Sequence, residues 1–456
     1  MFNAGFLRSL ERAIKDKNIY APSLQVWGSR YSSAGLNEVY ELWSRFIKSA
    51  DQQALNGIQL YLHFPFCYQN RCKYCMYDSK TINSCQDGVF VDYLRDMQKS
   101  LDFFKPLFKK IKLRSLYVGG GTPSLMGEAQ IASLLDNVFS SYSFNKNAEK
   151  AFENSPGTCT KEKIRIYRAF GINRISLGVQ SLQPEVLERN NRRFSSFNEI
   201  RELVDFSKET GIGFVNVDLM AGIEGQSPDF LINDFLKIWN GTKTDSVTVY
   251  IQRILQNNTG SGSGGTDGAA AKRAETIKRL RSAGEKQVEA LYRVYSKNNY
   301  LVKEDNHFIR NYSKELLRYK TRSIYEKNVS TIGMGYGAFS FILSRFHFLQ
   351  GRSGSFADWF RGGKNFRIAE YSDKEQRAYY ITDRLYASNR ISFNGYESFF
   401  GDKFEEKHKK IIDFLLRKKF IILTGQELIL TASGIERKHL IQYLFYPRKN
   451  LLKIIG

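Results

Sequence analysis

The chain has 456 residues, of which 42% are hydrophobic, and a formal net charge of +22. This size and hydrophobic content predict a globular protein with a large α/β domain and room for one or two small ones. No apolar run is long enough for a membrane span, and charged residues come too early in the chain for a signal peptide, so we expect a cytoplasmic protein without a membrane partner.

The positive charge reflects 68 Lys and Arg against 46 Asp and Glu. It fits an anionic small-molecule substrate, and it equally fits an ordinary solvated basic surface. No nucleic-acid-binding motif accompanies the charge, so a nucleic acid is not the expected partner. The five cysteines include three in one short stretch, which argues against a disulfide framework.

Residues 1–57 are expected to form a helical N-terminal extension. Within it, apolar residues recur at helical spacing from Leu36 to Ile47. Nothing in this extension points to catalysis, and its aromatic residues are expected to serve packing.

The next stretch carries the cysteine cluster. An alternating apolar run from Ile58 to Phe64 predicts a strand that ends at Pro65, and the thiols follow in a loop. Three thiolates on one loop can bind three irons of a 4Fe-4S cluster and leave the fourth iron open to a small molecule. A zinc site with His63 as fourth ligand and a group of packed free thiols are the alternatives. The three thiols belong to Cys67, Cys72 and Cys75.

A glycine-rich turn follows the second predicted strand. A helix from about Val89 to Phe104, ended by Pro106, leads into this strand at Ile111 to Val118. Gly119, Gly120 and Gly121 come next, and glycines at a strand end let backbone N–H groups approach a ligand closely. Strands and helices continue to alternate up to about residue 253, which predicts a parallel sheet with right-handed crossovers.

Several of these segments resemble the radical S-adenosylmethionine (SAM) superfamily, in its HemN-like branch. Tyr61 to Cys75 resembles the pattern Y-x-H-x-P-F-C-x-x-x-C-x-[FY]-C, although four residues separate the first two cysteines where the family has three. Arg174 to Ser181 is similar to R-[IL]-S-[LI]-G-[VI]-Q-S. The resemblance spans about residues 59–345 and implies a partial (β/α)6 barrel.

The resemblance also implies the cofactors and the residues that bind them. Cys67, Cys72 and Cys75 would bind a 4Fe-4S cluster, and one or two SAM molecules would bind beside it. The residues that match SAM-contacting positions of the family are Tyr61, Tyr74, Gly119, Gly120, Gly121, Thr122, Glu153, Gln180, Arg192 and Asp218. Of these, Tyr61, Gln180, Arg192 and Asp218 are expected to take part in catalysis. A one-electron donor such as flavodoxin or ferredoxin is the expected protein partner.

The HemN-like branch implies a radical SAM enzyme that acts on a small molecule. Because Gln180, Arg192 and Asp218 are retained, methylation or cyclopropanation with a second SAM is the preferred subclass, although Phe194 replaces the histidine of one motif. Tetrapyrrole modification is the alternative, but Tyr77 stands where coproporphyrinogen oxidase has a further cysteine. A non-catalytic haem chaperone is the third hypothesis. Such chaperones carry an H-N-x-x-Y motif, whose order is not reproduced around His307.

The remaining segments complete the predicted domain order. Residues 257–271 are low in complexity and predict a flexible linker inside the barrel domain, which spans 58–345. A long helix is expected from about Ala274 to Ser296. A connector occupies 346–371, and the short helices and hairpin of 372–456 predict a winged-helix-like α+β domain. The expected fold is therefore a partial barrel with a C-terminal winged-helix-like domain.

Overall fold

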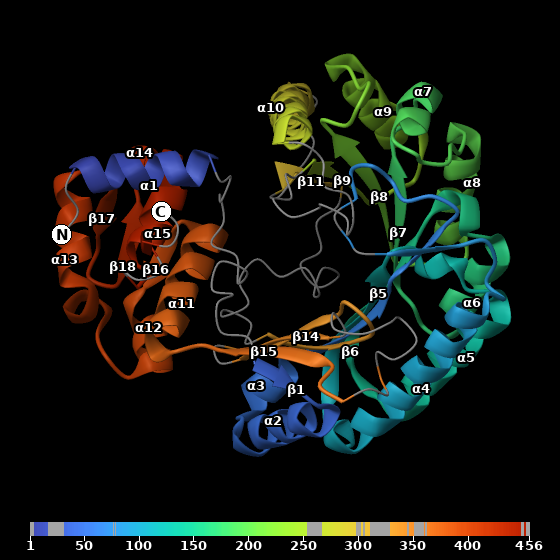
Figure 1. The fold of residues 1–456 in the computed structure, drawn as a ribbon, viewed down its shortest axis with the longest axis horizontal. Helices are drawn as coiled ribbons and strands as arrows, with labels where there is room; N and C mark the ends of the chain where they lie inside the picture. The colour runs from blue at the N-terminus through green and yellow to red at the C-terminus, as the bar shows by residue number, and fades with distance from the viewer. Residues whose placement is uncertain are drawn as a thin grey trace.

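The computed structural model describes residues 4–16, 32–75, 77, 79–252, 267–297, 302–303, 306–310, 329–343, 346–350, 360, 363–447 and 451–452. Its main feature is a curved sheet with helices on its outer face (Figure 1). None of the helices in the described ranges is long and apolar enough to cross a bilayer.

Six strands of this sheet run parallel and stand side by side in chain order. They are β2 (Ile58–Phe64), β5 (Lys112–Gly120), β6 (Ser143–Asn154), β7 (Arg174–Gln180), β8 (Phe214–Ala221) and β9 (Ser246–Ile251). The helices of these units are α4 (Gly88–Phe108), α5 (Glu128–Ser141), α6 (Lys161–Ala169), α7 (Pro184–Arg189), α8 (Phe197–Glu209), α9 (Pro228–Gly241) and α10 (Asp267–Lys297). The predicted parallel sheet of a (β/α)6 partial barrel is confirmed.

Further strands extend the sheet at both edges. β12 (Ser330–Met334) pairs in parallel with β2, and the strands beyond it are antiparallel. These outer strands are β13 (Phe339–Ile342), β14 (Phe346–Gln350), β15 (Phe366–Glu370) and β1 (Ser32–Ala34) on one side, with β11 (His307–Ile309) and β10 (Val302–Lys303) on the other.

Alternation along the strands separates an apolar outer face from a more polar inner face. Leu60 and Leu62 of β2 belong to the main hydrophobic core, whereas Tyr61 lies in a small separate cluster with Tyr117. Because successive strand residues point to opposite faces, the odd-numbered residues of β2 face the inside of the barrel.

Three local predictions need correction. α4 continues through Pro106 to Phe108, because a proline so near the carboxyl end interrupts only the last turn of the helix. Cys67 lies on a short strand, β3 (Phe66–Tyr68), which pairs with β4 (Lys80–Ile82), so the first thiol is not in a loop. Of the predicted linker, residues 267–271 belong to α10, and 257–266 lie outside the described residues.

The helices of the N-terminal extension pack against two different cores. α1 (Ala4–Asp16) buries Leu10 in the core of the C-terminal domain, and Arg437 Nη1 donates a 2.8 Å hydrogen bond to Glu11 of this helix (Figure 1). α2 (Leu36–Ser49) instead buries Trp43 in the core of the barrel, next to α3 (Gln52–Asn56).

The C-terminal domain is a small α+β unit. Its three-stranded sheet has the order β16-β18-β17, and β17 and β18 form the predicted hairpin. Its elements are α11 (Asp373–Ser388), β16 (Arg390–Ser392), α12 (Phe393–Phe400), α13 (Phe404–Arg417), β17 (Ile421–Leu423), β18 (Glu427–Leu430), α14 (Ala432–Glu436) and α15 (Lys438–Leu444).

Candidate functional site

The three clustered thiols lie beside the carboxyl ends of the parallel strands. All three are free and half-buried, and the backbone N–H of Cys75 donates to the carbonyl of Cys72 over 3.1 Å. Thr122 Oγ1 lies 4.0 Å from Cys67 Sγ, and Arg192 Nη1 lies 3.9 Å from Cys72 Sγ. The cysteine stretch thus meets the segments that follow β5 and β7.

The thiols are close enough to influence one another. Burial raises the pKa of the Cys75 thiol, and negative charge on Cys67 and Cys72 raises it further. Three deprotonated thiols at this position would therefore need a positive centre between them, as an iron-sulfur cluster provides. Within the described ranges no three His, Cys, Asp or Glu side chains converge as ligands of a single metal ion. Thiolates that each bind a different iron do not need to converge in that way.

The glycine turn fixes the cysteine strand to the end of β5. Gly121 N donates to Phe64 O over 2.8 Å, and Thr122 N donates to Phe66 O over 2.7 Å. A Cβ at Gly120, whose φ is +125°, would lie 2.8 Å from Phe64 O, and one at Gly121 would overlap the Phe66 carbonyl. Two of the three glycines are therefore required by backbone packing, before any ligand is considered.

Glu153, at the end of β6, closes the other side of this turn. It accepts a 2.6 Å hydrogen bond from the Tyr117 hydroxyl and a 3.1 Å bond from Gly120 N. A Cβ at Gly119 would lie 2.8 Å from Glu153 Oε2. Burial raises the pKa of Tyr117 well above its usual value, and the Glu153 charge adds to this shift. The analysis of the sequence missed Tyr117, although it shares a strand face with Gly119, two residues further on.

Tyr61 and His63 form a pair on the inner face of β2. The Tyr61 hydroxyl lies 2.5 Å from His63 Nδ1, and burial lowers the pKa of His63 to about 4. A Cβ at Gly337 would lie 3.5 Å from His63 Nε2, which is an ordinary contact distance, so Gly337 lies directly beside the second ring nitrogen. His63 is thus a neutral partner of Tyr61. Among the described residues it does not converge with two other ligands on a single metal ion, so its predicted alternative role as a zinc ligand gains no support.

Gln180 and Arg192 meet at the end of β7. Gln180 has a φ of +74°, and its Oε1 is buried without a hydrogen-bond partner among the described residues. Arg192 Nη2 donates to Ser155 Oγ over 3.1 Å and to the carbonyl of Gly178. A Cβ at Gly178 would lie 3.0 Å from Gln180 Nε2 and 3.4 Å from Arg192 Nη2. The geometry therefore joins Gln180, Arg192 and Cys72 in one place.

The remaining predicted site residues border this region. Asp218 of β8 is paired in register with Gly178 and accepts a 2.7 Å hydrogen bond from Asn216 Nδ2. Tyr74 packs against the cluster that contains Met220, and burial raises the pKa of its hydroxyl well above the usual value. His307 stands apart from the cysteines, on β11 at the other side of β9.

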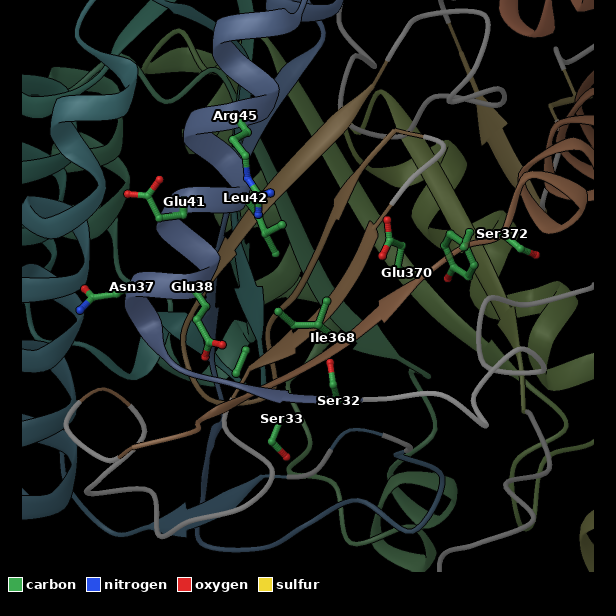
Figure 2. A pocket seen from close by; sticks show the side chains of 12 residues that line it. Ser32, Ser33, Asn37, Glu38, Glu41, Leu42, Arg45, Ile368, Glu370 and Ser372 are labelled. Carbon is green, nitrogen blue, oxygen red and sulfur yellow. The ribbon is translucent and has the colours of Figure 1, made fainter.

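A cavity of about 880 Å³ lies elsewhere, between α2 and the strands β1 and β15 (Figure 2). Glu38, Glu41, Arg45 and Glu370 are among its lining residues. None of the predicted site residues lines it, so we place the candidate site at the strand ends rather than in this cavity.

Much of the barrel is similar in sequence to known proteins. Residues 61–234 match the family model of the radical SAM superfamily. The heme chaperone HemW of Haemophilus influenzae is 36% identical over 183 residues, which cover 40% of this chain and 47% of the relative. The oxygen-independent coproporphyrinogen III oxidase of Bradyrhizobium diazoefficiens is 32% identical over 169 residues, or 37% of each chain. The matched segments thus span less than half of these relatives.

A solved structure extends the similarity in fold to nearly the whole chain. Coproporphyrinogen III oxidase (HemN) of Escherichia coli, described as a radical SAM enzyme, superposes with a TM-score of 0.75 at 18% identity. The superposition covers 96% of this chain and 98% of that one. At this identity the similarity shows a shared fold, and the identity of the substrate has to be argued from the site.

Proposed function

Because this chain carries a radical SAM domain of the HemN-like branch, we propose that it is a radical SAM protein that acts on a tetrapyrrole. The radical SAM family implies a 4Fe-4S cluster and SAM as cofactors. When bound and reduced, the cluster supplies the electron that cleaves SAM and makes it a reagent for hydrogen abstraction. The observation that carries the proposal is the placement of three half-buried free thiols beside Thr122 and Arg192.

The residues of the chain have separate roles in this proposal. Cys67, Cys72 and Cys75 hold the cluster, and Arg192 balances thiolate charge beside Cys72. Glu153, held by Tyr117 and Gly120, presents a carboxylate to the amino group of SAM.

The side-chain amide of Gln180 offers its unpaired oxygen to the same ligand. Tyr61 and Asp218, on the inner face of the barrel, border the substrate. Tyr74 packs at the rim of the cysteine stretch.

Exposed aromatic side chains support a large planar substrate. Tyr77, Phe194, Tyr250 and Phe339 are 52%, 42%, 40% and 42% exposed. The Phe339 ring lies 5.8 Å from that of Tyr61, and the Tyr77 ring lies 6.4 Å from that of His63. Aromatic faces of this kind stack well on a flat conjugated ring.

A haem chaperone is the second candidate. HemW proteins are among the relatives, and Tyr77 occupies the position at which the oxidase pattern has a further cysteine. In this case the inner face of the barrel would bind haem as cargo, without turnover of SAM. Methylation or cyclopropanation stays a hypothesis, since the relatives named above give it no support.

One experiment separates these candidates. The protein is loaded anaerobically with iron and sulfide, reduced with dithionite and given SAM, and 5′-deoxyadenosine and S-adenosylhomocysteine are followed by mass spectrometry. A radical SAM enzyme forms 5′-deoxyadenosine, and Cys67→Ala, Cys72→Ala or Cys75→Ala abolishes it, whereas Cys85→Ala outside the cluster does not. S-adenosylhomocysteine would indicate methyl transfer. A loaded protein that binds haemin but forms neither product would favour the chaperone.

A further inference from the structure

The backbone of Gln180 has a conformation that a residue with a side chain does not favour. Its φ of +74° is in the left-handed region, which residues with a side chain rarely adopt. The pairing between β7 and β8 shifts by one residue between Gly178 and Gln180, so a bulge stands at this point. Such a conformation persists only where the surrounding structure holds it.

The residues directly after Gln180 are held by a single carboxylate. Asp234 Oδ2 accepts hydrogen bonds from Ser181 Oγ over 2.7 Å and from Leu182 N over 2.9 Å. Asp234 Oδ1 accepts from Gln183 Nε2 over 2.7 Å. Three consecutive residues therefore have the same partner, which comes from α9, more than fifty positions away along the chain.

This carboxylate is itself immobilised. Asp234 is 1% exposed, and both of its oxygens are engaged by the turn. Ser181 N also donates to Val179 O over 3.0 Å, so the chain turns sharply at Gln180 itself. With 181–183 fixed to α9 and Gly178 fixed to β8, Gln180 has little freedom to leave its left-handed conformation.

We propose that Asp234 is a positioning residue, which holds the turn 181–183 and thereby aims the side-chain amide of Gln180 at the strand-end site. The inference rests on the proposed function in one respect, that the ligand of this amide is SAM. If 181–183 were released, Gln180 would relax to an extended conformation, and its side chain would move away from Gly178 and Arg192.

The test compares Asp234→Asn with Asp96→Asn, which alters an equally buried aspartate on α4, away from the site. In the protein without added SAM, hydrogen exchange is followed in a peptide that covers 178–187. We expect faster exchange at the Leu182 amide in Asp234→Asn and wild-type exchange in Asp96→Asn. On the cluster-loaded protein, we expect Asp234→Asn to weaken SAM binding by about tenfold, because hydrogen bonds to a buried charge are lost.

A double-mutant cycle distinguishes positioning from general destabilisation. In a Gln180→Ala background, which lacks the amide, Asp234→Asn should weaken SAM binding no further. If Asp234→Asn does not fold, Ser181→Ala, which removes one of the three hydrogen bonds, takes its place. Wild-type exchange together with wild-type SAM affinity in the variant, or an undiminished effect in the Gln180→Ala background, would overturn the proposal. A wild-type protein that binds no SAM would instead refute the proposed function, and the exchange data would still decide the role of Asp234.

Discussion

The hydroxyl of Tyr117 lies 2.6 Å from Glu153 Oε1, across the two parallel strands β5 and β6. Glu153 accepts a second bond from Gly120 N, so the tyrosine and the glycine turn together orient one carboxylate. Because Tyr117 keeps its proton, it acts as a donor throughout the physiological pH range.

Removal of this donor should weaken SAM binding. In Tyr117→Phe, Glu153 keeps only one of these two hydrogen bonds, and a lost bond to a carboxylate is worth about 1 to 2 kcal/mol, or roughly five- to thirtyfold in affinity. Equilibrium dialysis of SAM against the cluster-loaded protein measures the change. Phe152→Leu, on the outer face of β6, is the control for a general loss of packing. Unchanged affinity in Tyr117→Phe would show that Glu153 is oriented by other contacts.

A second prediction concerns stability. Arg174 Nη1 donates a 2.6 Å bond to Glu149 Oε1, and these side chains are 1% and 0% exposed. Glu149→Gln leaves the guanidinium charge buried without its anion, which costs about 3 to 5 kcal/mol in the free energy of unfolding. Combined replacement by Glu149→Leu and Arg174→Met should cost less than this single change.

Urea denaturation measures the free energy of unfolding of the single and the double variant. Glu289→Gln, in the exposed pair with Arg293, should change stability by at most about 1 kcal/mol. If Glu149→Gln lowers the free energy of unfolding no more than Glu289→Gln does, the buried charge of Arg174 does not depend on Glu149 for its stabilisation.

Much of the barrel could be predicted because local patterns decide it. The runs at 58–64, 174–180 and 246–251 alternate or are strongly apolar, and each is a strand in the structure. The short spacing of the cysteines likewise predicted that three thiols lie close together. The end of the helix predicted from Pro106 was wrong, because a proline indicates that a helix is about to end but not how many residues its last turn contains.

Contacts between distant segments could not be predicted. Nothing near Asp234 indicates that its carboxylate holds a turn at 181–183, because the relationship depends on how α9 packs against the end of β7. The same is true of α1, whose Leu10 is buried in the C-terminal core although the helix begins the chain. Local propensity favours a helix in that segment but does not specify its partner.

A third prediction tests the glycine turn without reference to SAM. Gly121→Ala should reduce cluster incorporation, because the added Cβ would overlap the Phe66 carbonyl and push the Cys67 strand out of place. The measurement is iron and sulfide bound per chain after anaerobic loading. Gly88→Ala is the matched control, since nothing lies within 4 Å of its Cβ position. Equal iron content in the two variants would contradict the assigned packing role.

A fourth prediction concerns pH. Burial lowers the pKa of His63 to about 4, against 6.5 for an ordinary histidine, so the unfolded chain binds this proton more readily than the folded one. The contribution of His63 to stability is therefore complete above pH 6.5 and is lost as the pH falls towards 4, by about 3 kcal/mol over the whole window.

His63→Phe should reduce the slope of unfolding free energy against pH in this window by up to one proton. His408→Phe, whose pKa is also lowered to about 4 by burial but which lies in the C-terminal domain, should reduce the slope only where that domain unfolds with the barrel. In the folded protein His63 becomes protonated only as the pH approaches 4, where the Tyr61 hydroxyl would lose its neutral partner, so SAM cleavage should fall near that pH. A slope unaffected by His63→Phe would show that the imidazole is accessible to protons in the folded protein.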